Sequence, residues 1–511
     1  MGCDDHGTAA AYGRGADADR SALHRPVFDR PCLHGGGAAT CGGTMNHPVL
    51  RISDMSIKDK GGALLVDRIC FAVEWGAAFV LIGETGSGKS LVAQAVLGLL
   101  PVGLLVSGRI EFDGEMVGLA DRTALRRHWT HHLALMPQEP RSALDPTMRV
   151  LPQIAGIAQQ ARARAAMASV SLHDTVERQY PFMLSGGMAQ RVLVAGALTT
   201  DARVIIADEP TKGLDDDRVE EAVSRLRQIQ EHGRAVFAIT HDIRVAQGLG
   251  GQLAVMREGR LLEQGPVDSV VSAPRHAYTR AWLAADPDRW HARKVSGSVE
   301  PVLEADNLSY RIGSRTLFHD LSLELCQGCI TAVTGPSGSG KTMLCNVLLG
   351  LARPSAGTVR WKDGTDPHLV RRPPLRSRYQ KLHQDPASAF VPGRLLRRQF
   401  ADLRSVLSPG HIERDLPSLL ERLELDAALL DRRPDEVSGG QLQRIAIARV
   451  LLFDPLCLIA DEPTSRLDPL IQRDVMELLR ELVHERGMSL VLTSHDRRLM
   501  RAVAHDVVQL G

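Results

Sequence analysis

The feature that most constrains this chain is an internal repeat. Four short segments of the first half recur in the same order, 252 to 254 residues further along. They are Gly83–Ser90 and Gly335–Thr342, Leu184–Gly187 and Val437–Gly440, Ala207–Thr211 and Ala460–Thr464, and Thr240–Asp242 and Ser494–Asp496. Landmarks that keep both order and spacing indicate two homologous halves. The 511 residues, which length alone would divide into about three domains, therefore predict two repeated units.

The repeat divides the chain into a tail, two domains and a linker. We expect the tail at residues 1–44, the first domain at 45–285, the linker at 286–301 and the second domain at 302–511. The tail is rich in Gly, Ala, Asp, His and Cys and has no hydrophobic period. This is typical of disorder, or of a start codon assigned too early. A metal-binding tract is the alternative interpretation of its histidines and cysteines.

Composition limits the classes of partner. The formal net charge is +1, so no global basic field exists to attract nucleic acid. No stretch approaches the roughly 20 apolar residues that span a bilayer, so any membrane partner is expected to be another chain. The eight cysteines are irregularly spaced, which favours a reducing, cytosolic setting. We interpret the isolated Cys-x-x-Cys pair, Cys326 and Cys329, as structural.

Each half is predicted to be an α/β unit. Apolar runs at Ala78–Ile82 and Ile330–Thr334 lead into glycine loops, and helical periodicity follows at Ser90–Leu100 and Thr342–Leu351. Further buried strands are expected at Val204–Ala207, Leu456–Ala460, Ala235–Thr240 and Ser489–Thr493. Continuous apolar runs of this kind are typical of a parallel sheet that is covered on both faces.

The two glycine loops match GxxxxGK[ST], the nucleotide phosphate loop. In such a loop backbone N–H groups surround phosphate oxygens, and the next helix directs its positive end at the same anion. The lysine supplies charge to the β- and γ-phosphates, and the last hydroxyl is a ligand for Mg²⁺. The residues are Gly83, Glu84, Thr85, Gly86, Ser87, Gly88, Lys89 and Ser90, and then Gly335, Pro336, Ser337, Gly338, Ser339, Gly340, Lys341 and Thr342. A simple glycine turn before a helix is the alternative, and the context of both loops disfavours it.

Two carboxylate pairs, Asp208–Glu209 and Asp461–Glu462, follow apolar strands. The aspartate would lie beside the phosphate loop and hold Mg²⁺ through water, and the glutamate would deprotonate an attacking water. A solvated acidic turn is the alternative for either pair alone. His241 and His495 each end a further apolar strand, and their recurrence favours a γ-phosphate contact over a structural role.

A Ser-Gly-Gly triplet recurs at the start of a predicted helix in each half. It consists of Ser185, Gly186 and Gly187, and of Ser438, Gly439 and Gly440. The serine is either a helix cap or, with the neighbouring N–H groups, a contact for an anion.

Together these landmarks resemble the ATP-binding cassette (ABC) ATPases. The glycine loops correspond to Walker A, the carboxylate pairs to Walker B, the Ser-Gly-Gly segments to the signature, and Gln138 and Gln384 to the glutamine loops. The resemblance implies two tandem P-loop NTPase domains, each with a RecA-like α/β core, a helical signature subdomain and an antiparallel β subdomain. It implies ATP and Mg²⁺ as ligands, with the halves paired head to tail so that each ATP lies between one Walker A and the other half's signature.

The family's roles transfer to numbered positions of this chain. Implied catalytic residues are Glu209, Glu462, His241, His495, Gln138 and Gln384, and implied Mg²⁺ ligands are Ser90, Thr342, Gln138, Gln384, Asp208 and Asp461. The family usually stacks adenine on an aromatic residue before Walker A. Tyr310 matches this position in the second half, whereas Ile57 occupies it in the first, so we expect weaker ATP binding at the first site. Met188 stands where the signature usually has glutamine.

Two further motifs look like the oligopeptide, dipeptide and nickel importer ATPases. They are Gln138–Pro146, with its Gln-Glu-Pro and Leu-Asp-Pro elements, and His276–Arg280. This implies import of a small solute, of peptide or nickel-chelate type, through two transmembrane permease subunits and, indirectly, an extracytoplasmic solute-binding protein. The chain would lie on the cytoplasmic face of the inner membrane, with no nucleic-acid partner. Alternatives are a tandem monosaccharide-importer ATPase, which tends to have one degraded half, and a soluble ABC protein acting on ribosomes or DNA.

Overall fold

The computed structural model describes residues 48–510, except 130, 138–140, 142, 156–159, 212–215, 291–299, 337, 370–374 and 465–466. The predicted tail and most of the predicted linker lie outside the described residues, as do Gln138 and Ser337. The domain boundaries proposed from the repeat stay predictions. Among the described residues, no helix combines the length and the apolar character needed to cross a bilayer.

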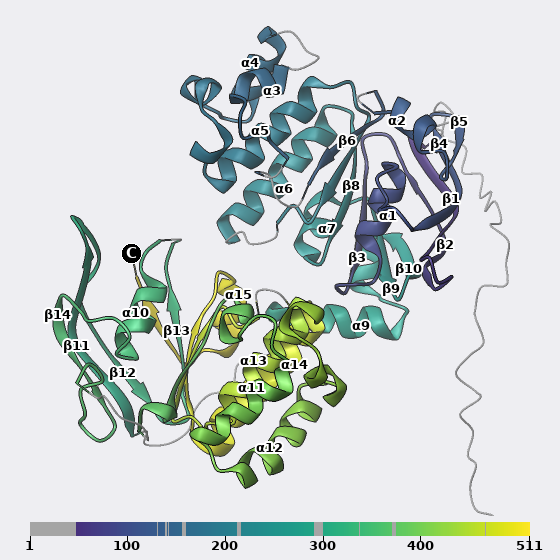
Figure 1. The fold of residues 1–511 in the computed structure, drawn as a ribbon. Coiled ribbons are helices and arrows are strands. Elements are labelled where there is room, and N and C mark those ends of the chain that lie inside the picture. The colour runs from purple at the N-terminus through teal and green to yellow at the C-terminus, as the bar shows by residue number, and fades with distance from the viewer. Residues whose placement is uncertain are drawn as a thin grey trace, which may run out of the picture. The chain divides into compact units, whose positions relative to one another are not determined.

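The first half contains two sheets (Figure 1). An antiparallel sheet has the strand order β2-β1-β4-β5, and a second sheet has the order β10-β9-β3-β8-β7-β6, parallel except for the β9–β10 pair. The strands are β1 (Leu50–Lys58), β2 (Leu64–Val73), β3 (Ala78–Gly83), β4 (Leu105–Phe112), β5 (Glu115–Gly118), β6 (Leu133–Met136), β7 (Val204–Asp208), β8 (Ala235–Thr240), β9 (Gln252–Arg257) and β10 (Arg260–Pro266).

The second half repeats this plan. An antiparallel sheet has the order β12-β11-β14, and an entirely parallel sheet has the order β15-β16-β17-β13-β18. The strands are β11 (Pro301–Ile312), β12 (Arg315–Cys326), β13 (Ile330–Thr334), β14 (Ala356–Trp361), β15 (Tyr379–Leu382), β16 (Cys457–Asp461), β17 (Ser489–Thr493) and β18 (Asp506–Gln509).

Helices complete each half. Those of the first half are α1 (Lys89–Val96), α2 (Arg122–Arg127), α3 (Val150–Ala155), α4 (Gln160–Ser169), α5 (Gly186–Thr199), α6 (Asp216–Glu231), α7 (Ile243–Leu249), α8 (Val267–Ser272) and α9 (Ala277–Ala284), with 3-10 turns η1 (Asp174–Arg178), η2 (Pro181–Met183) and η3 (Pro287–Arg289). Those of the second are α10 (Lys341–Leu348), α11 (Leu396–Asp402), α12 (Pro409–Arg422), α13 (Gly439–Leu451), α14 (Pro469–Arg486) and α15 (Arg497–Val503), with η4 (Leu375–Arg378), η5 (Pro386–Ala389), η6 (Leu403–Ser405), η7 (Ala427–Asp431) and η8 (Pro434–Glu436).

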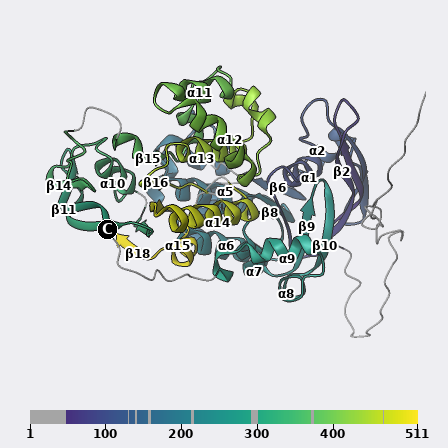
Figure 2. The same ribbon diagram turned by 90° about the horizontal axis from the view of Figure 1, so that it is seen from below.

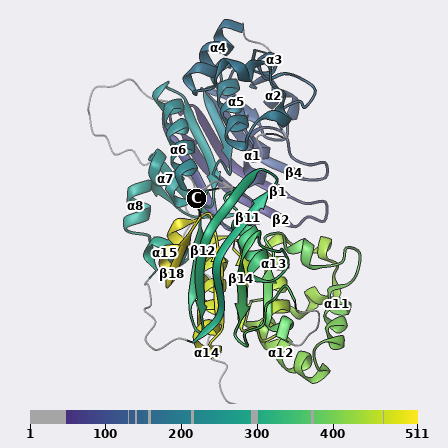
Figure 3. The same cartoon turned by 90° about the vertical axis from the view of Figure 1, so that its left-hand side faces the viewer.

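Within each half, the parallel sheet lies between the antiparallel sheet and a lobe of helices. The views in Figures 1 and 3 show α3, α4 and α5 on one side of the first half's large sheet and β1, β2 and β4 on the other. Figures 1 and 2 show the same layering in the second half, with α11, α12 and α13 opposite β11 and β14. The predicted α/β fold, with a helical subdomain and an antiparallel β subdomain in each half, is confirmed.

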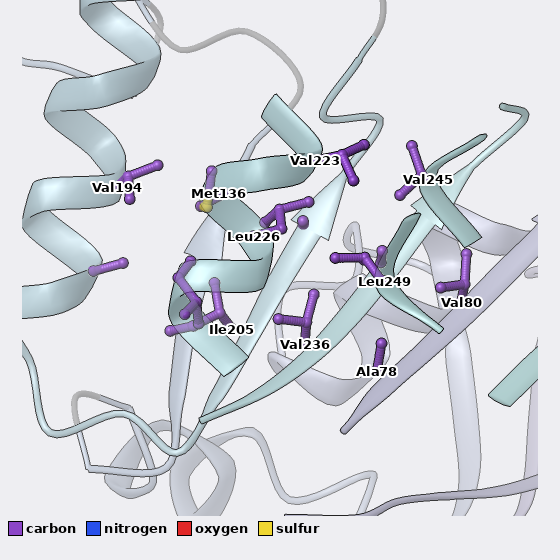
Figure 4. Close-up of a cluster of buried hydrophobic side chains, with 14 of the residues drawn as sticks. Ala78, Val80, Met136, Val194, Ile205, Val223, Leu226, Val236, Val245 and Leu249 are labelled. Atoms are coloured by element: carbon purple, nitrogen blue, oxygen red, sulfur yellow. The ribbon is translucent and has the colours of Figure 1, made fainter. Parts of the chain in front are cut away.

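The strands of the parallel sheets are buried because helices cover them. Figure 4 shows Val223 and Leu226 of α6 packed toward Ile205 and Val236 of β7 and β8, and Val245 of α7 beside Val80 of β3. These residues belong to one apolar cluster of the first half, and each is at most 8% exposed. Burial of this kind, worth roughly 25 cal/mol per Å² of apolar surface, fixes the strand ends from which the candidate site residues project.

Two predicted helices end earlier in the structure than their apolar period suggested. We expected them to reach Leu100 and Leu351, but α1 ends at Val96 and α10 at Leu348. Each is followed by a glycine with φ near 65°, Gly98 or Gly350. The next N–H donates back to a carbonyl five residues earlier, which closes the helix C-terminus. The apolar run continues past each helix end, where Leu100 and Leu349 are buried but Leu99 and Leu351 are exposed.

Candidate functional site

Both glycine loops connect a buried parallel strand to a helix, as predicted. At Gly83, which ends β3, a Cβ atom would lie 2.1 Å from the carbonyl oxygen of Met256 on β9. At Gly335, the same atom would lie 2.5 Å from the carbonyl oxygen of Leu510. The loops therefore need glycine at this position because the neighbouring strand passes too close for any side chain.

The two loop lysines are buried and held by the loops themselves. Lys89 is 6% exposed, and its Nζ donates to the carbonyl oxygens of Gly83 and Glu84, both at 2.7 Å. Lys341 is 8% exposed, and its Nζ donates to Gly335 at 2.7 Å and Pro336 at 3.1 Å. Burial lowers the pKa of Lys89, and the carboxylates of Glu209 and Asp208 oppose that shift.

The loops also contain buried hydroxyls that suit an anionic ligand. The Oγ atoms of Ser87 and Ser339 are buried and lack a hydrogen-bond partner among the described residues. Both serines occupy the same place, two residues before the loop lysine. A phosphate oxygen would satisfy such a donor, so the chemistry of both loops fits a nucleotide phosphate.

A hydroxyl and a carboxylate meet at the start of α1. Ser90 Oγ lies 3.5 Å from Asp208 Oδ1, at the end of β7. These are hard oxygen donors of the type that Mg²⁺ prefers, so this pair fits the metal that the sequence implied. In the second half Asp461 is more enclosed. Its Oδ1 accepts a hydrogen bond from Thr493 Oγ1 at 2.6 Å, and its Oδ2 lies 3.9 Å from Lys381 Nζ.

Each predicted glutamate contacts its predicted histidine. In the first half His241 Nδ1 is 2.8 Å from Glu209 Oε2, and in the second His495 Nε2 is 2.6 Å from Glu462 Oε1. The contact uses a different ring nitrogen in each half. In the second half Gln384 Nε2 also donates to Glu462 Oε2 at 2.7 Å.

Both glutamates have a backbone conformation that is unusual for a residue with a side chain. Their φ values are 48° for Glu209 and 51° for Glu462. The neighbouring strand holds this conformation, because the Glu209 N–H donates to Ile239 at 2.8 Å and the Glu462 N–H donates to Thr493 at 3.0 Å. Such backbone strain is concentrated at functional sites, and here it directs both carboxylates toward the histidines.

The protonation of these pairs follows from their surroundings. Burial alone would lower the pKa of His241, but the hydrogen bond and charge of Glu209, together with Asp242, raise it. Burial would raise the pKa of Glu462, yet His495, then Gln384 and Lys341, hold it below its usual value. Glu462 is therefore a carboxylate at neutral pH, as a proton acceptor must be.

The Ser-Gly-Gly triplets begin helices α5 and α13, and both serines are N-caps. Ser185 Oγ accepts from the Met188 N–H at 3.2 Å, and Ser438 Oγ accepts from the Gln441 N–H at 3.3 Å. Only α13 has the reciprocal bond, from the Ser438 N–H to Gln441 Oε1 at 3.0 Å. The methionine at the signature therefore removes half of a capping box. A Cβ added at Gly186, Gly187 or Gly439 would meet no atom within 4 Å, so these backbones are open to a ligand.

We predict that Met188→Gln and Gln441→Met shift helix stability in opposite directions. The first supplies the missing side-chain acceptor and should stabilise the chain by about 0.5–1 kcal/mol, and the second should destabilise it by a similar amount. Urea denaturation of both variants measures this. Shifts of the same sign in the two variants would contradict the capping interpretation.

The structure also shows how the two halves differ at the position where the resemblance implies adenine stacking. Tyr310 on β11 stacks on Phe318 at 5.9 Å between ring centroids, and Phe318 lies against Gly340 of the phosphate loop. In the first half the paired residues are Ile57 and Val66, and Val66 lies against Gly88. Ile57 is fully buried, whereas Tyr310 is partly exposed. An aromatic surface is therefore available beside the second loop, and an aliphatic core pair takes its place beside the first.

Tyr310→Ala is accordingly expected to weaken ATP binding at the second site by about 1–3 kcal/mol, the loss measured for base–aromatic stacking. Ile57→Ala should leave ATP affinity at the first site unchanged and act on stability instead, because its side chain is in the core. Equilibrium binding of ATP to both variants, in full-length protein, distinguishes the two effects. Equal losses of affinity would remove the predicted asymmetry.

Some residues near the site were not predicted. Thr493 and Lys381 contact Asp461 in the second half, but Ile239 stands where Thr493 does after alignment on the histidines, so the repeat gave no signal for it. The i, i+3, i+4 spacing of His128, His131 and His132 would suit a metal face on a helix, but α2 ends at Arg127, before these residues. The ring of His128 stacks on Phe112 at 4.5 Å, which is a packing role.

Contacts between the halves include residues beside both histidines. Asp216, the first residue of α6, accepts from the Arg497 N–H at 2.9 Å and from Arg244 at 2.7 Å. Arg498 also forms an ion pair at 3.2 Å with Asp286, the first residue of the predicted linker. The segments that follow His241 and His495 are therefore connected through charged residues.

Both halves thus have the geometry of P-loop nucleotide hydrolases. The protein-family comparison agrees, because the ABC transporter family model matches residues 66–212 and 318–465. The chain belongs to this family, binds nucleotide and is an ATPase with two tandem ABC domains.

Curated relatives resemble the chain over most of its length. The peptidoglycan transport ATP-binding protein YejF of Agrobacterium fabrum is 33% identical over 503 residues, which covers 91% of each chain. The glutathione import ATP-binding protein GsiA of Escherichia coli is 30% identical over 534 residues, covering 90% of this chain and 84% of the relative. Among solved structures, the archaeal ribosome recycling factor aABCE1, in complex with the stalk protein aP1, has a TM-score of 0.64. At 20% identity, over 89% of this chain and 87% of that one, it shows the shared fold alone.

Proposed function

We propose that this chain is the ATP-hydrolysing subunit of an importer for peptide-containing solutes, which works through separate membrane permease subunits. The observation that carries this proposal is similarity along both halves to relatives that transport peptidoglycan or import glutathione. Both named solutes contain peptide linkages. A nickel or metal-chelate solute remains an alternative outcome of the test below.

The two ATP sites are composite. Lys89, Asp208, Glu209 and His241 act with Ser438, Gly439 and Gly440, while Lys341, Gln384, Asp461, Glu462 and His495 act with Ser185, Gly186 and Gly187. The open backbones of Gly186, Gly187 and Gly439, at which a Cβ would meet no atom within 4 Å, support this pairing. Gln138 is assigned to the first site by the repeat.

Within each site the residues have separate tasks. The lysine and the loop N–H groups bind the β- and γ-phosphates, and the serine or threonine and the Walker B aspartate hold Mg²⁺, which neutralises phosphate charge. The strained glutamate accepts a proton from the attacking water. The histidine orients that carboxylate, to which it is already bonded at 2.8 or 2.6 Å. Gln384 restrains the second glutamate from the opposite side.

ATP binding closes the two halves and hydrolysis releases them, because the composite contacts exist only in the closed state. Covalent linkage raises the effective concentration of each half for the other. The helical lobes, about 139–195 and 385–447, dock on the permease subunits at the cytoplasmic face of the membrane.

The proposal is tested by solute uptake in cells that lack the chain. Cells complemented with wild type or with Glu209→Gln/Glu462→Gln are compared for uptake of labelled glutathione, a muropeptide, a tripeptide and Ni²⁺. We expect peptide-containing solutes to enter only with wild-type chain, which should be recovered with the membrane fraction. Unchanged uptake of every solute, with recovery on ribosomes, would reject an importer and favour a soluble ABC protein.

A further inference from the structure

A chain of contacts connects the His276–Arg280 segment to the phosphate loop of the first half. Arg257, the last residue of β9, lies between them. Its Nε is 3.5 Å from Glu84 Oε1, and its guanidinium carbon is 5.0 Å from the centroid of the Tyr278 ring. Arg257 also lies 3.3 Å from Glu258 Oε1, so its charge is shared between two carboxylates.

Glu84 is the loop residue on which these contacts converge. Its carboxylate faces Arg257, and its carbonyl oxygen accepts a hydrogen bond from Lys89 Nζ at 2.7 Å. A shift of Glu84 would therefore move one of the two acceptors that hold the loop lysine. The Arg257 contact acts on the side chain of the same residue, whereas Lys89 contacts its backbone.

The ring of Tyr278, over which the Arg257 guanidinium lies, is fixed in position by its surroundings. Tyr278 is 6% exposed, and its N–H donates to His276 Nδ1 at 3.1 Å in the N-cap of α9. The segment before it is fixed by Glu263 of β10, which accepts from the N–H groups of Arg275 and His276 at 2.8 and 3.0 Å. The helix cap and the β9–β10 hairpin thus hold the aromatic ring in place. The Arg257 guanidinium lies over this ring in a cation–π contact.

In the second half the loop lysine has the equivalent backbone acceptor, but a different residue supplies it. Pro336 stands where the first loop has Glu84, and its carbonyl oxygen accepts from Lys341 Nζ at 3.1 Å. A proline ring fixes φ near −65°, so this loop carries its own backbone restraint. Glu84 has no such restraint and depends on contacts from outside the loop.

We propose that Arg257 and Tyr278 are positioning residues that hold the first phosphate loop through the Glu84 carboxylate, a task that Pro336 performs within the second loop. This inference rests on the proposed role of the loop in ATP binding. It gives the His276–Arg280 segment a function in the first site. It also makes the ATP affinity of the first site depend on a cation that the second site does not need.

The test measures ATP hydrolysis by full-length protein in a Glu462→Gln background, where turnover comes from the first site. Arg257→Gln is expected to raise KM for ATP about three- to ten-fold, the range for losing a partly exposed ion pair and a cation–π contact, with little change in kcat. Tyr278→Leu should act in the same direction. Arg260→Gln is the matched control, because Arg260 pairs with Asp67 at 2.9 Å rather than with the loop.

A rescue separates positioning from a general structural defect. Adding Glu84→Pro to Arg257→Gln places the second loop's own restraint in the first loop, and KM should return close to that of the parent. An unchanged KM in Arg257→Gln, or no recovery in the double variant, overturns the proposal. Loss of all turnover in the Glu462→Gln parent would instead reject the first site's assignment, so the two failures are distinguishable.

Discussion

Glu462→Gln is expected to slow ATP hydrolysis at the second site by about 10²–10⁴-fold while ATP still binds. In the proposed mechanism this carboxylate accepts the proton, and its pKa is held below the usual value by His495, despite burial. An amide has the same shape and retains an oxygen for the hydrogen bond from Gln384, but it cannot take up a proton. Glu209→Gln should have the same effect at the first site.

The nucleotides trapped in each variant measure this prediction. After incubation with ATP and rapid removal of free nucleotide, each single variant should retain unhydrolysed ATP in one site, and the double variant in both. Glu424→Gln is a closely matched control, because Glu424 has the same backbone conformation, with φ of 51°, but its side chain is exposed and belongs to neither carboxylate pair. Complete conversion to ADP in Glu462→Gln would contradict the assignment of the second site.

Much of the framework could be predicted because the repeat marks it twice. The strands at Ala235–Thr240, Ile330–Thr334 and Ser489–Thr493 match β8, β13 and β17 residue for residue. A buried parallel strand is a continuous apolar run with abrupt ends, so sequence locates it well.

Other features depend on packing that no local pattern encodes. Recurrence predicted a γ-phosphate contact for His241 and His495, but the contact of each histidine with a glutamate, and the use of a different ring nitrogen in each half, emerge only from the fold. Ile57 was recognised as a departure from an aromatic residue, yet its complete burial emerges only from the fold. The contact of Arg257 with Glu84 joins distant parts of the sequence, so the His276–Arg280 motif gave no indication of where it would lie. Roles for Gln138 and Ser337 stay predictions.

Gly83→Ala is expected to destabilise the first half by about 1–3 kcal/mol and to abolish ATP binding at its site. The new Cβ would lie 2.1 Å from the Met256 carbonyl oxygen and 3.1 Å from Ser87 Oγ. The Met256 carbonyl is fixed, because β9 is paired with β3 through Gly83 and Met256 themselves. The loop must therefore move away from β9, which displaces the carbonyl oxygen that holds Lys89.

Gly196→Ala is a control in which the same substitution is expected to increase stability rather than decrease it. Gly196 lies inside α5, and a Cβ there would meet no atom within 4 Å. Alanine in a helix interior is favoured over glycine, so this variant should gain up to about 1 kcal/mol. Urea denaturation and ATP-binding measurements on both variants test the pair. An unchanged unfolding midpoint and normal ATP affinity in Gly83→Ala would contradict this prediction. They would show that β9 can move away to make room for the methyl group, and that the close approach of β3 and β9 does not determine the conformation of the phosphate loop.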